Sequence, residues 1–188
     1  MIDISDEELY RRMKAGDKAA LVELYERREP GLYRYALHMS GSRVVAEEVT
    51  HEVFFRLIGP GVKFDPRLGS LEAYLHGVAR NLLRGIARIA QREPELTEVK
   101  AAAEHDLLKS LIDDEMTAAL HLALQDLTPE YRDAVVLCDL EERSYEDAAK
   151  LMDCPIGTVR SRLHRARGLL ASKLKRFKTA PGSRTVVA

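Results

Sequence analysis

The sequence predicts an all-α protein made of two small helical domains joined by a flexible linker, the C-terminal domain being a helix-turn-helix. Hydrophobic residues make up 46% and charged residues 31% of the 188-residue chain, a balance typical of packed amphipathic helices. Apolar residues recur at intervals of three and four, which is the helical spacing. Capping residues, glycines and prolines divide these stretches into separate helices.

Clear start and stop signals divide the beginning of the chain. A capping box begins at Ser5, and Gly16 ends the first helix. Asp17 caps the second helix. Pro30 and the glycine after it are expected to interrupt that helix, because proline cannot donate the backbone hydrogen bond. A third helix is then expected to run to about Ser40.

Two longer helices complete the predicted N-terminal domain, residues 1–94. The fourth helix is expected from about 44 to 58, where Gly-Pro-Gly ends it. The fifth is expected from 71 to about 92, after a loop at 62–69. This fifth helix has an apolar stripe that steps by three and four residues. The stripe consists of Leu71, Leu75, Val78, Leu82, Ile86 and Ile89.

The hydrophobic pattern weakens after Pro94, and an acidic stretch of small residues predicts a flexible linker at 95–113. A second helical domain is expected at 114–176. Thr128 and the proline after it place an N-cap and a first-turn proline at the start of one of its helices. Residues 177–188 contain proline, glycine and serine and predict a disordered tail.

The segment 144–167 has the features of a helix-turn-helix. A capped helix is expected at 145–152, where the small residue Ala149 permits close helix contact. Asp153 is expected to adopt the left-handed conformation in the turn, because aspartate enters that region more readily than most residues. The second helix begins near residue 156. Its inward stripe is Val159, Leu163, Ala166 and Leu170.

The outward face of that second helix is polar and cationic. From Gly157 to Lys178 there is no acidic residue, although the whole chain has a net charge of −1. Arginine on such a face can donate two hydrogen bonds to guanine, and a helix N-terminus can hold a phosphate. A basic helix can also be only a solvated face. The cap, turn and inward stripe nevertheless agree in register, which favours DNA contact.

No pattern in the sequence indicates an enzyme, a metal site or a bound cofactor. Nucleophile motifs, phosphate-binding glycine loops and metal-ligand spacings among the six histidines are all missing. Cys138 and Cys154 form no close pair. Cys154 fits a small buried hydrophobe better than a redox-active thiol. An acidic N-terminus and the lack of an apolar run of about 18 residues predict a soluble cytoplasmic protein.

The C-terminal signature resembles region four of the extracytoplasmic-function (ECF) sigma factors of bacterial RNA polymerase. The resemblance lies in the segments 127–132 (LTPEYR), 144–149 (SYEDAA) and 153–167 (DCPIGTVRSRLHRAR). In that family this domain recognises the upstream, minus thirty-five promoter element. The resemblance implies the same role for Thr158, Arg160, Ser161, His164 and Arg165.

The N-terminal part resembles region two of the same family, at 16–20 (GDKAA), 46–54 (AEEVTHEVF) and 69–75 (GSLEAYL). This implies that the fourth helix docks on the clamp helices of the largest polymerase subunit. From the residue pattern alone, Phe55 could instead complete the core, with solvated charges around it. The candidate polymerase-binding residues are Glu48, His51, Glu52, Phe55 and Arg56.

The resemblance also implies that the fifth helix and the loop before it recognise and open the minus ten element. The basic face of this helix could equally be solvated, and the family match rather than the spacing favours DNA. Tyr74 stands where the family usually has tryptophan, and Gly77 replaces a common arginine. The candidate residues for the minus ten region are Arg80, Asn81, Arg84 and Arg88.

These patterns together predict a transcription initiation factor that binds core RNA polymerase and double-stranded promoter DNA and recognises both promoter elements. The resemblance shows no region one and no long region three, so control is expected from an anti-sigma factor as a further partner or from the chain's own tail. Two other functions stay open. A helix-turn-helix regulator acting without polymerase would bind duplex DNA tightly by itself, whereas a decoy for an anti-sigma factor would never touch DNA.

Overall fold

The computed structural model describes residues 4–61, 64–92 and 115–179, and every regular element within these ranges is a helix. The all-α prediction is therefore confirmed. The predicted linker at 95–113 lies outside the described residues. The elements are α1 (Asp6–Lys14), α2 (Lys18–Ser40), α3 (Arg43–Ile58), α4 (Leu71–Arg92), α6 (Glu115–Gln125), α7 (Pro129–Val135), η1 (Val136–Leu140), α8 (Tyr145–Met152) and α9 (Ile156–Thr179).

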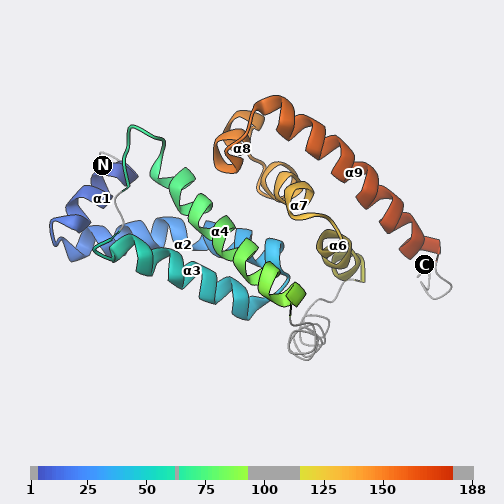
Figure 1. Cartoon of the computed structure of the whole chain (residues 1–188), viewed down its shortest axis with the longest axis horizontal. Coiled ribbons are helices and arrows are strands. Elements are labelled where there is room, and N and C mark those ends of the chain that lie inside the picture. Colours follow the sequence, from blue (N-terminus) through green and yellow to red (C-terminus); the bar gives the residue numbers. More distant parts are fainter. Residues whose placement is uncertain (1–3, 62–63, 93–114, 180–188) are drawn as a thin grey trace, which may run out of the picture.

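The helices form two groups that lie side by side (Figure 1). In the N-terminal group, α2 packs against α1, α3 and α4. In the C-terminal group, α9 packs against α6, α7 and α8. The buried apolar residues of both groups belong to one continuous cluster. The two predicted helical domains are thus present, and they are in direct contact with each other.

The predicted capping residues stand at the helix starts. The Ser5 hydroxyl accepts a hydrogen bond from the Glu8 amide at 3.3 Å, and the Asp17 carboxylate accepts from the amides of Ala19 and Ala20. Pro129 begins α7 at a position where the N–H has no partner within the helix in any case. Interactions with nearby residues therefore define the N-termini of these helices, as the sequence predicted.

The predicted break at Pro30 is wrong, because α2 continues through it from Lys18 to Ser40. Pro30 is exposed, so the carbonyl left without its usual N–H partner is on the side of the helix that water can reach. Leu24 before the proline and Leu32 and Tyr35 after it are all buried. Packing of this face against neighbouring helices holds α2 together across the missing hydrogen bond.

α4 has the predicted bounds, but its buried stripe is rotated from the predicted one. The buried apolar residues are Leu71, Leu75, Ala79 and Leu83, while Val78, Leu82 and Ile86 are partly buried. Ile89, also predicted on the stripe, is 63% exposed, and His76 is buried. α4 contacts α2 and α3 from its own domain and also α8 from the other. Periodicity alone could not show that a second domain would cover part of this helix.

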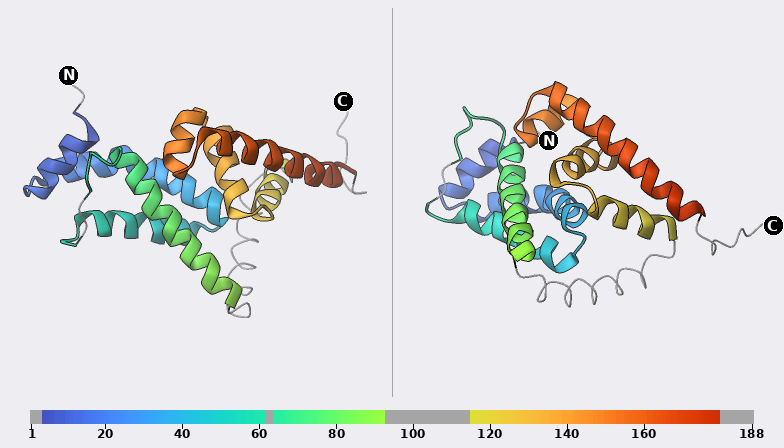
Figure 2. Two further views of the ribbon diagram at one scale, coloured as in Figure 1. Left: turned by 45° about the horizontal axis from the view of Figure 1, so that its top comes forward. Right: turned by 45° about the vertical axis from the view of Figure 1, so that its right-hand side comes forward.

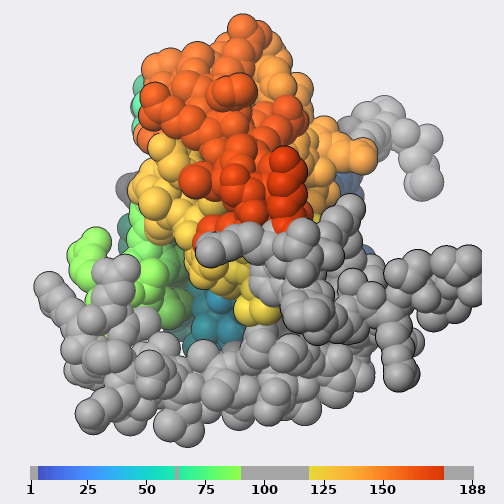
Figure 3. Space-filling model, turned by 90° about the vertical axis from the view of Figure 1, so that its right-hand side faces the viewer, coloured from blue at the N-terminus to red at the C-terminus, as the bar shows by residue number. Residues whose placement is uncertain are grey.

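The C-terminal group differs from the prediction in two places. A short π-helix, η1, continues α7, and Glu142 follows it with a left-handed φ of 53°. α9, which forms the outer surface of this group in Figure 3, extends to Thr179. Residues 177–179 are therefore helical rather than part of the predicted tail, and 180–188 lie outside the described residues.

A buried polar interface joins the two domains. The Tyr35 hydroxyl on α2 donates a hydrogen bond to the Asp133 carboxylate on α7 at 2.8 Å. Arg143 Nη2 lies 2.7 Å from Glu72 Oε1 on α4. Both views in Figure 2 place α8 next to α4. Burial raises the pKa of the Tyr35 hydroxyl well above its usual value, so this group remains a proton donor.

Glu141 adds a buried titratable group to this interface. Its Oε1 has no hydrogen-bond partner among the described residues. Burial raises the pKa of the carboxyl to about 7, against the opposing attraction of Arg143. An unfolded glutamate titrates near about 4.3. The stability that protonated Glu141 contributes is therefore complete below about pH 4.3 and is lost as the pH rises to about 7.

We predict that Glu141→Gln, which is neutral at every pH, gains stability relative to the unmodified chain as the pH increases. The difference in unfolding free energy should grow by about 1–2 kcal/mol between pH 5 and pH 8. Denaturant unfolding at several pH values measures it. Glu142→Gln, at the exposed position next in the chain, is the control and should show no such trend. A pH-independent difference for Glu141→Gln would contradict the prediction.

Candidate nucleic-acid and polymerase interfaces

The helix-turn-helix forms with the predicted turn. The Ser144 hydroxyl accepts a hydrogen bond from the Asp147 amide at 3.0 Å and starts α8. Asp153 adopts the left-handed conformation, with φ 51° and ψ 56°. The Asp153 amide donates to the Lys150 carbonyl at 3.2 Å, and the Cys154 amide donates to the Ala149 carbonyl at 3.0 Å. These bonds end α8 and set the direction in which α9 begins.

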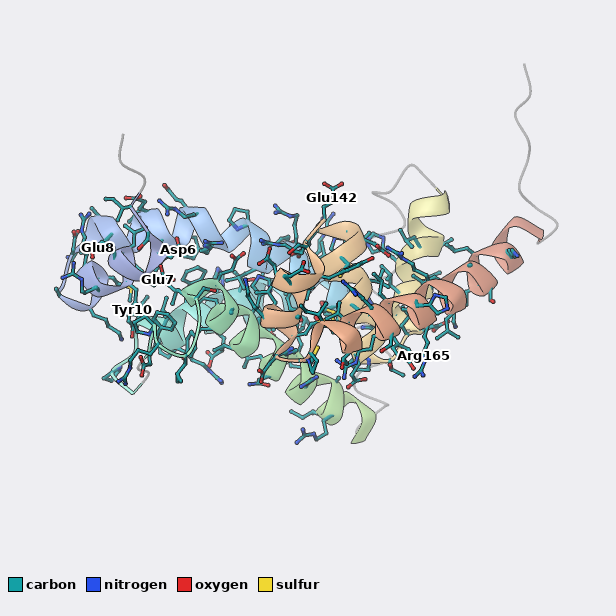
Figure 4. The ribbon with its side chains drawn as sticks, turned by 90° about the horizontal axis from the view of Figure 1, so that it is seen from above. Asp6, Glu7, Glu8, Tyr10, Glu142 and Arg165 are labelled. Carbon is teal, nitrogen blue, oxygen red and sulfur yellow. The ribbon has the colours of Figure 1, made fainter. Side chains whose placement is uncertain are left out.

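α9 buries one face and exposes the other, as predicted. The inward residues Val159, Leu163, Ala166 and Leu170 are all buried. The predicted DNA-binding residues Arg160, Ser161, His164 and Arg165 are exposed on α9, and Thr158 beside them is half-buried. Figure 4 shows Arg165 far from Asp6, Glu8 and Tyr10, at the other end of the molecule. We call the five predicted DNA-binding residues the recognition face.

Two contacts shape the start of the recognition face. The guanidinium carbon of Arg160 lies 5.6 Å from the centroid of the Tyr145 ring, in cation–π contact. The Ser161 hydroxyl donates to the Thr158 carbonyl at 3.0 Å. Neither contact uses a carboxylate. Arg160 therefore keeps its charge and exposed donors while Tyr145 on α8 supports its position.

Two cations beside the recognition face are paired with carboxylates of the same domain. Arg167 makes a two-pronged ion pair with Asp139, at 3.0 and 2.5 Å, and this bonding raises the Arg167 pKa. Lys173 lies 2.6 Å from the Asp126 carboxylate. Both pairs are on the surface of the C-terminal domain, where ion pairs contribute little to stability. A competing phosphate could replace either carboxylate.

α3 carries a second candidate surface. Val53, Phe54 and Leu57 are buried against the domain core, whereas Phe55 is 74% exposed. The alternative that Phe55 completes the core is therefore wrong. A groove of about 520 Å³ between α3 and α4 is lined by Glu48, Val49, His51, Glu52, Phe55, Leu82 and Ile86. Arg56 is next to this groove and pairs with Glu52 at 2.7 Å. We call this the Phe55 groove.

The four predicted residues on α4 are not equivalent. Asn81, Arg84 and Arg88 are exposed, but the Arg80 side chain is only 12% exposed. Arg80 Nη1 faces the C-terminal domain and lies 3.7 Å from Asp133 Oδ2. The prediction that all four lie along one accessible basic face is therefore wrong for Arg80. The rotation of α4 toward the second domain is the reason.

A cavity of about 650 Å³ lies between the domains, beside this basic face. Its walls come from α4, from the loop before α4, and from α8, the turn and α9. The sequence indicated the loop and Tyr74 as part of a site, but it did not indicate that Lys150 on α8 lines the same cavity. No signal in the sequence indicates that the α8 end of the chain faces α4, because only the domain contact brings them together.

The described part of the chain offers no group of three or more His, Cys, Asp or Glu side chains suited to a metal ion. Among the same residues, none of the helices combines the length and the hydropathy needed to cross a membrane. Cys138 and Cys154 are both half-buried and are not joined in a disulfide.

Comparison with known proteins gives matches over both domains. The family Sigma-70 region 2 matches residues 24–93, and Sigma-70, region 4 matches residues 117–170. The ECF RNA polymerase sigma factor SigE of Mycolicibacterium smegmatis is 35% identical over an alignment of 167 residues that covers 85% of this chain and 64% of that protein. This chain thus spans slightly less than two thirds of the length of that relative. The ECF RNA polymerase sigma factor SigC of Mycobacterium tuberculosis is 32% identical, covering 82% of this chain and 83% of its own length.

Two solved structures have the same fold. CnrH, in complex with the cytosolic domain of CnrY, aligns with a TM-score of 0.67 at 20% identity and covers 91% of this chain and 97% of that one. The sigma factor RpoE from Bartonella quintana, in complex with the anti-sigma factor NepR, aligns with a TM-score of 0.58 at 24% identity and covers 81% and 95%.

We predict that Asp153→Val destabilises the protein by about 1–2 kcal/mol, because a β-branched residue is strained at positive φ. Asp153→Asn should change the unfolding free energy by less than about 0.5 kcal/mol, since asparagine also enters this region readily. Thermal unfolding of the two variants compares them directly. Equal stabilities would show that the turn tolerates any residue.

Proposed function

The chain belongs to the ECF sigma factors of the sigma-70 family, and from that membership we propose that it joins core RNA polymerase and directs it to promoters. In this role it acts in the cytoplasm as an initiation factor and is not itself an enzyme. The observation that carries the proposal is the recognition face. A cationic helix face stands exposed on a complete helix-turn-helix, in the position that this motif inserts into the major groove.

The recognition face supports contact with the minus thirty-five element. Arg160 and Arg165 are exposed and have no carboxylate partner among the described residues, so their guanidinium groups are free to donate to guanine O6 and N7. His164 and Ser161 lie between them in sequence and can reach base edges or phosphates. Arg167 and Lys173 are placed to contact the DNA backbone after exchanging Asp139 and Asp126 for phosphates.

The Phe55 groove supports docking on the polymerase. An exposed aromatic side chain surrounded by charged residues has the composition of a protein interface, where one ring fills a pocket and polar groups form the rim. Val53 and Phe54 already occupy the core, so the fold of α3 does not need Phe55. The groove lies on α3 and α4 and leaves α9 free. Polymerase and upstream DNA can therefore be bound together.

The loop before α4 and the basic residues of α4 support contact with the minus ten region. Leu68 is 88% exposed on this loop, and Arg84 and Arg88 are exposed on the helix. Leu68 and Arg84 line the same cavity, and exposed apolar and cationic groups that lie near each other suit unpaired bases and their phosphates. The RpoE structure contains the anti-sigma factor NepR, and by analogy an anti-sigma factor is a partner of this chain too.

The two alternatives are separated by simple observations. A regulator independent of polymerase leaves the Phe55 groove without a role, and an anti-sigma decoy leaves the recognition face without one. Purified protein should be added to core RNA polymerase with fragmented genomic DNA, and the transcripts sequenced. Start sites preceded by two spaced motifs are expected. If no start site depends on the added protein, while a known sigma factor works in the same mixture, the proposal fails.

We predict that Arg160→Ala combined with Arg165→Ala lowers promoter-dependent transcription by about 10-fold or more, through loss of base contacts. Transcript yield from an identified promoter measures the effect. Arg11→Ala with Lys18→Ala removes the same charge from exposed positions in the N-terminal domain and serves as the control. Full transcription by the Arg160 and Arg165 variant would remove the recognition face from promoter binding.

We predict that Phe55→Ala weakens binding to core RNA polymerase by about 10-fold, the effect of losing one interface anchor. Stability should change by less than about 0.5 kcal/mol, because the ring is exposed. Fluorescence titration of labelled protein with core polymerase measures the affinity. Val22→Ala, at another exposed apolar position, is the control. Unchanged affinity of the Phe55 variant would remove the groove from the polymerase interface.

A further inference from the structure

The helix α1 bonds to both ends of the loop that joins α3 to α4. At the end of α3, Lys14 Nζ donates hydrogen bonds to the carbonyls of Ile58 and Gly59 at 3.2 and 2.9 Å. At the start of α4, Glu7 Oε1 accepts a hydrogen bond from the Leu71 amide at 3.1 Å. One short helix therefore ties together the two helix ends between which the loop runs.

The charges of these two contacts suit the helix ends that they meet. The last carbonyls of a helix carry partial negative charge and the first amides carry partial positive charge, and neither set has partners within its own helix. Lys14 brings a cation to the end of α3, and Glu7 brings a carboxylate to the start of α4. The bond from the Leu71 amide is the main cause of a lowered Glu7 pKa, so this carboxyl stays ionised.

Tyr10 holds the loop at a third point. Its hydroxyl oxygen accepts a hydrogen bond from the Phe64 amide at 3.2 Å. The two rings meet edge to face, with centroids 5.4 Å apart, and Phe64 is buried. On its other side the Phe64 ring contacts Tyr74 of α4, with 5.7 Å between centroids. Phe64 therefore anchors the loop between α1 and α4.

The three contacts come from one face of α1. Glu7, Tyr10 and Lys14 are spaced three and four residues apart, and residues with this spacing lie on one side of a helix. Figure 4 shows Glu7 and Tyr10 near each other on α1. We call the three the loop-holding residues. Leu9 and Met13 on the inward side are buried, and they fix α1 to the core of the domain.

The middle of the loop is exposed to solvent. Leu68 is 88% exposed, and the Arg67 side chain pairs with Asp65 only two residues earlier. A groove of about 430 Å³ lies between α1 and the loop residues Phe64 and Pro66, so side chains do not fill the whole seam. The direction in which the exposed part of the loop projects therefore depends on the bonds at its ends.

We propose that α1 controls how selectively this loop recognises the minus ten element: Glu7, Tyr10 and Lys14 are positioning residues that hold the loop in the conformation that meets the bases. They act through the loop and not by contact with DNA. A group that discriminates between bases must be held within about 0.5 Å of its working position. This inference rests on the proposed function, since it concerns the same minus ten contact.

The test variant carries Glu7→Ala, Tyr10→Phe and Lys14→Met, which remove the hydrogen bonds from α1 to the loop and keep an aromatic ring beside Phe64. Hydrogen exchange of the free protein reports on the loop, because Tyr10 and Glu7 accept bonds from the amides of Phe64 and Leu71. Exchange at these two amides should become about 5-fold faster. Helical content, measured by circular dichroism, should stay unchanged.

Selectivity is measured with core RNA polymerase on an identified promoter and on copies in which one base of the minus ten element is changed. With the unmodified chain, one changed base should lower transcription by about 10-fold. With the test variant, this ratio should fall to about 2-fold. A general loss of stability would lower transcription from every template by the same factor and would leave the ratio unchanged, so the ratio isolates the positioning role.

The matched control carries Tyr25→Phe, Glu26→Ala and Lys18→Met, which remove the same chemical groups from α2 and also keep the net charge. Its loop exchange and its selectivity ratio should stay within about 2-fold of those of the unmodified chain. A rescue variant, Glu7→Gln with Lys14→Arg, keeps an acceptor and a donor at the two helix ends and should retain the full ratio.

Two results would overturn the proposal. Unchanged exchange in the test variant would show that α1 does not hold the loop, and faster exchange with an unchanged ratio would show that holding it does not affect selectivity. Tyr10→Phe alone guards against misfolding of the triple variant, and it should change exchange at Phe64 and the ratio in the same directions, each by about 2-fold. If the unmodified chain directs no transcription, the proposed function itself fails, which differs from a working chain whose ratio is insensitive to α1.

Discussion

The carboxylate of Asp133 is buried between the domains, where it accepts a hydrogen bond from Tyr35 and faces the guanidinium of Arg80. A carboxylate taken out of water is strongly unfavourable unless such partners surround it. Both partners belong to the other domain. The charge on α7 is therefore satisfied only when α2 and α4 are in place, and this requirement links the orientation of the domains to the accessibility of α4.

The same contact between the domains covers one of the three candidate surfaces and leaves the other two exposed to solvent. The recognition face and the Phe55 groove need no rearrangement, because the core of each domain is complete without them. Arg80 is different, since it is part of the contact that joins the domains. The domain contact thus covers Arg80 and leaves the recognition face and the Phe55 groove exposed.

Local signals in the sequence were sufficient for most of the helix boundaries and for the helix-turn-helix. Asp17 and Ser144 cap helices, and Asp153 turns the chain, through bonds to atoms only a few residues away. Pro30 shows where such signals fail. Its local preference is to interrupt a helix, but the burial of Leu24, Leu32 and Tyr35 on one face is a property of the folded domain.

The sequence by itself determined the helical class, the family resemblance and the exposed face of α9, because these follow from periodicity and from contacts within one motif. Only the tertiary structure decided that Phe55 is exposed, that the buried stripe of α4 is rotated and that Arg80 faces Asp133. A single amphipathic helix has two flanks with similar patterns. Which flank meets a partner depends on residues about 50 positions away in the chain, and their placement follows from packing rather than from local sequence.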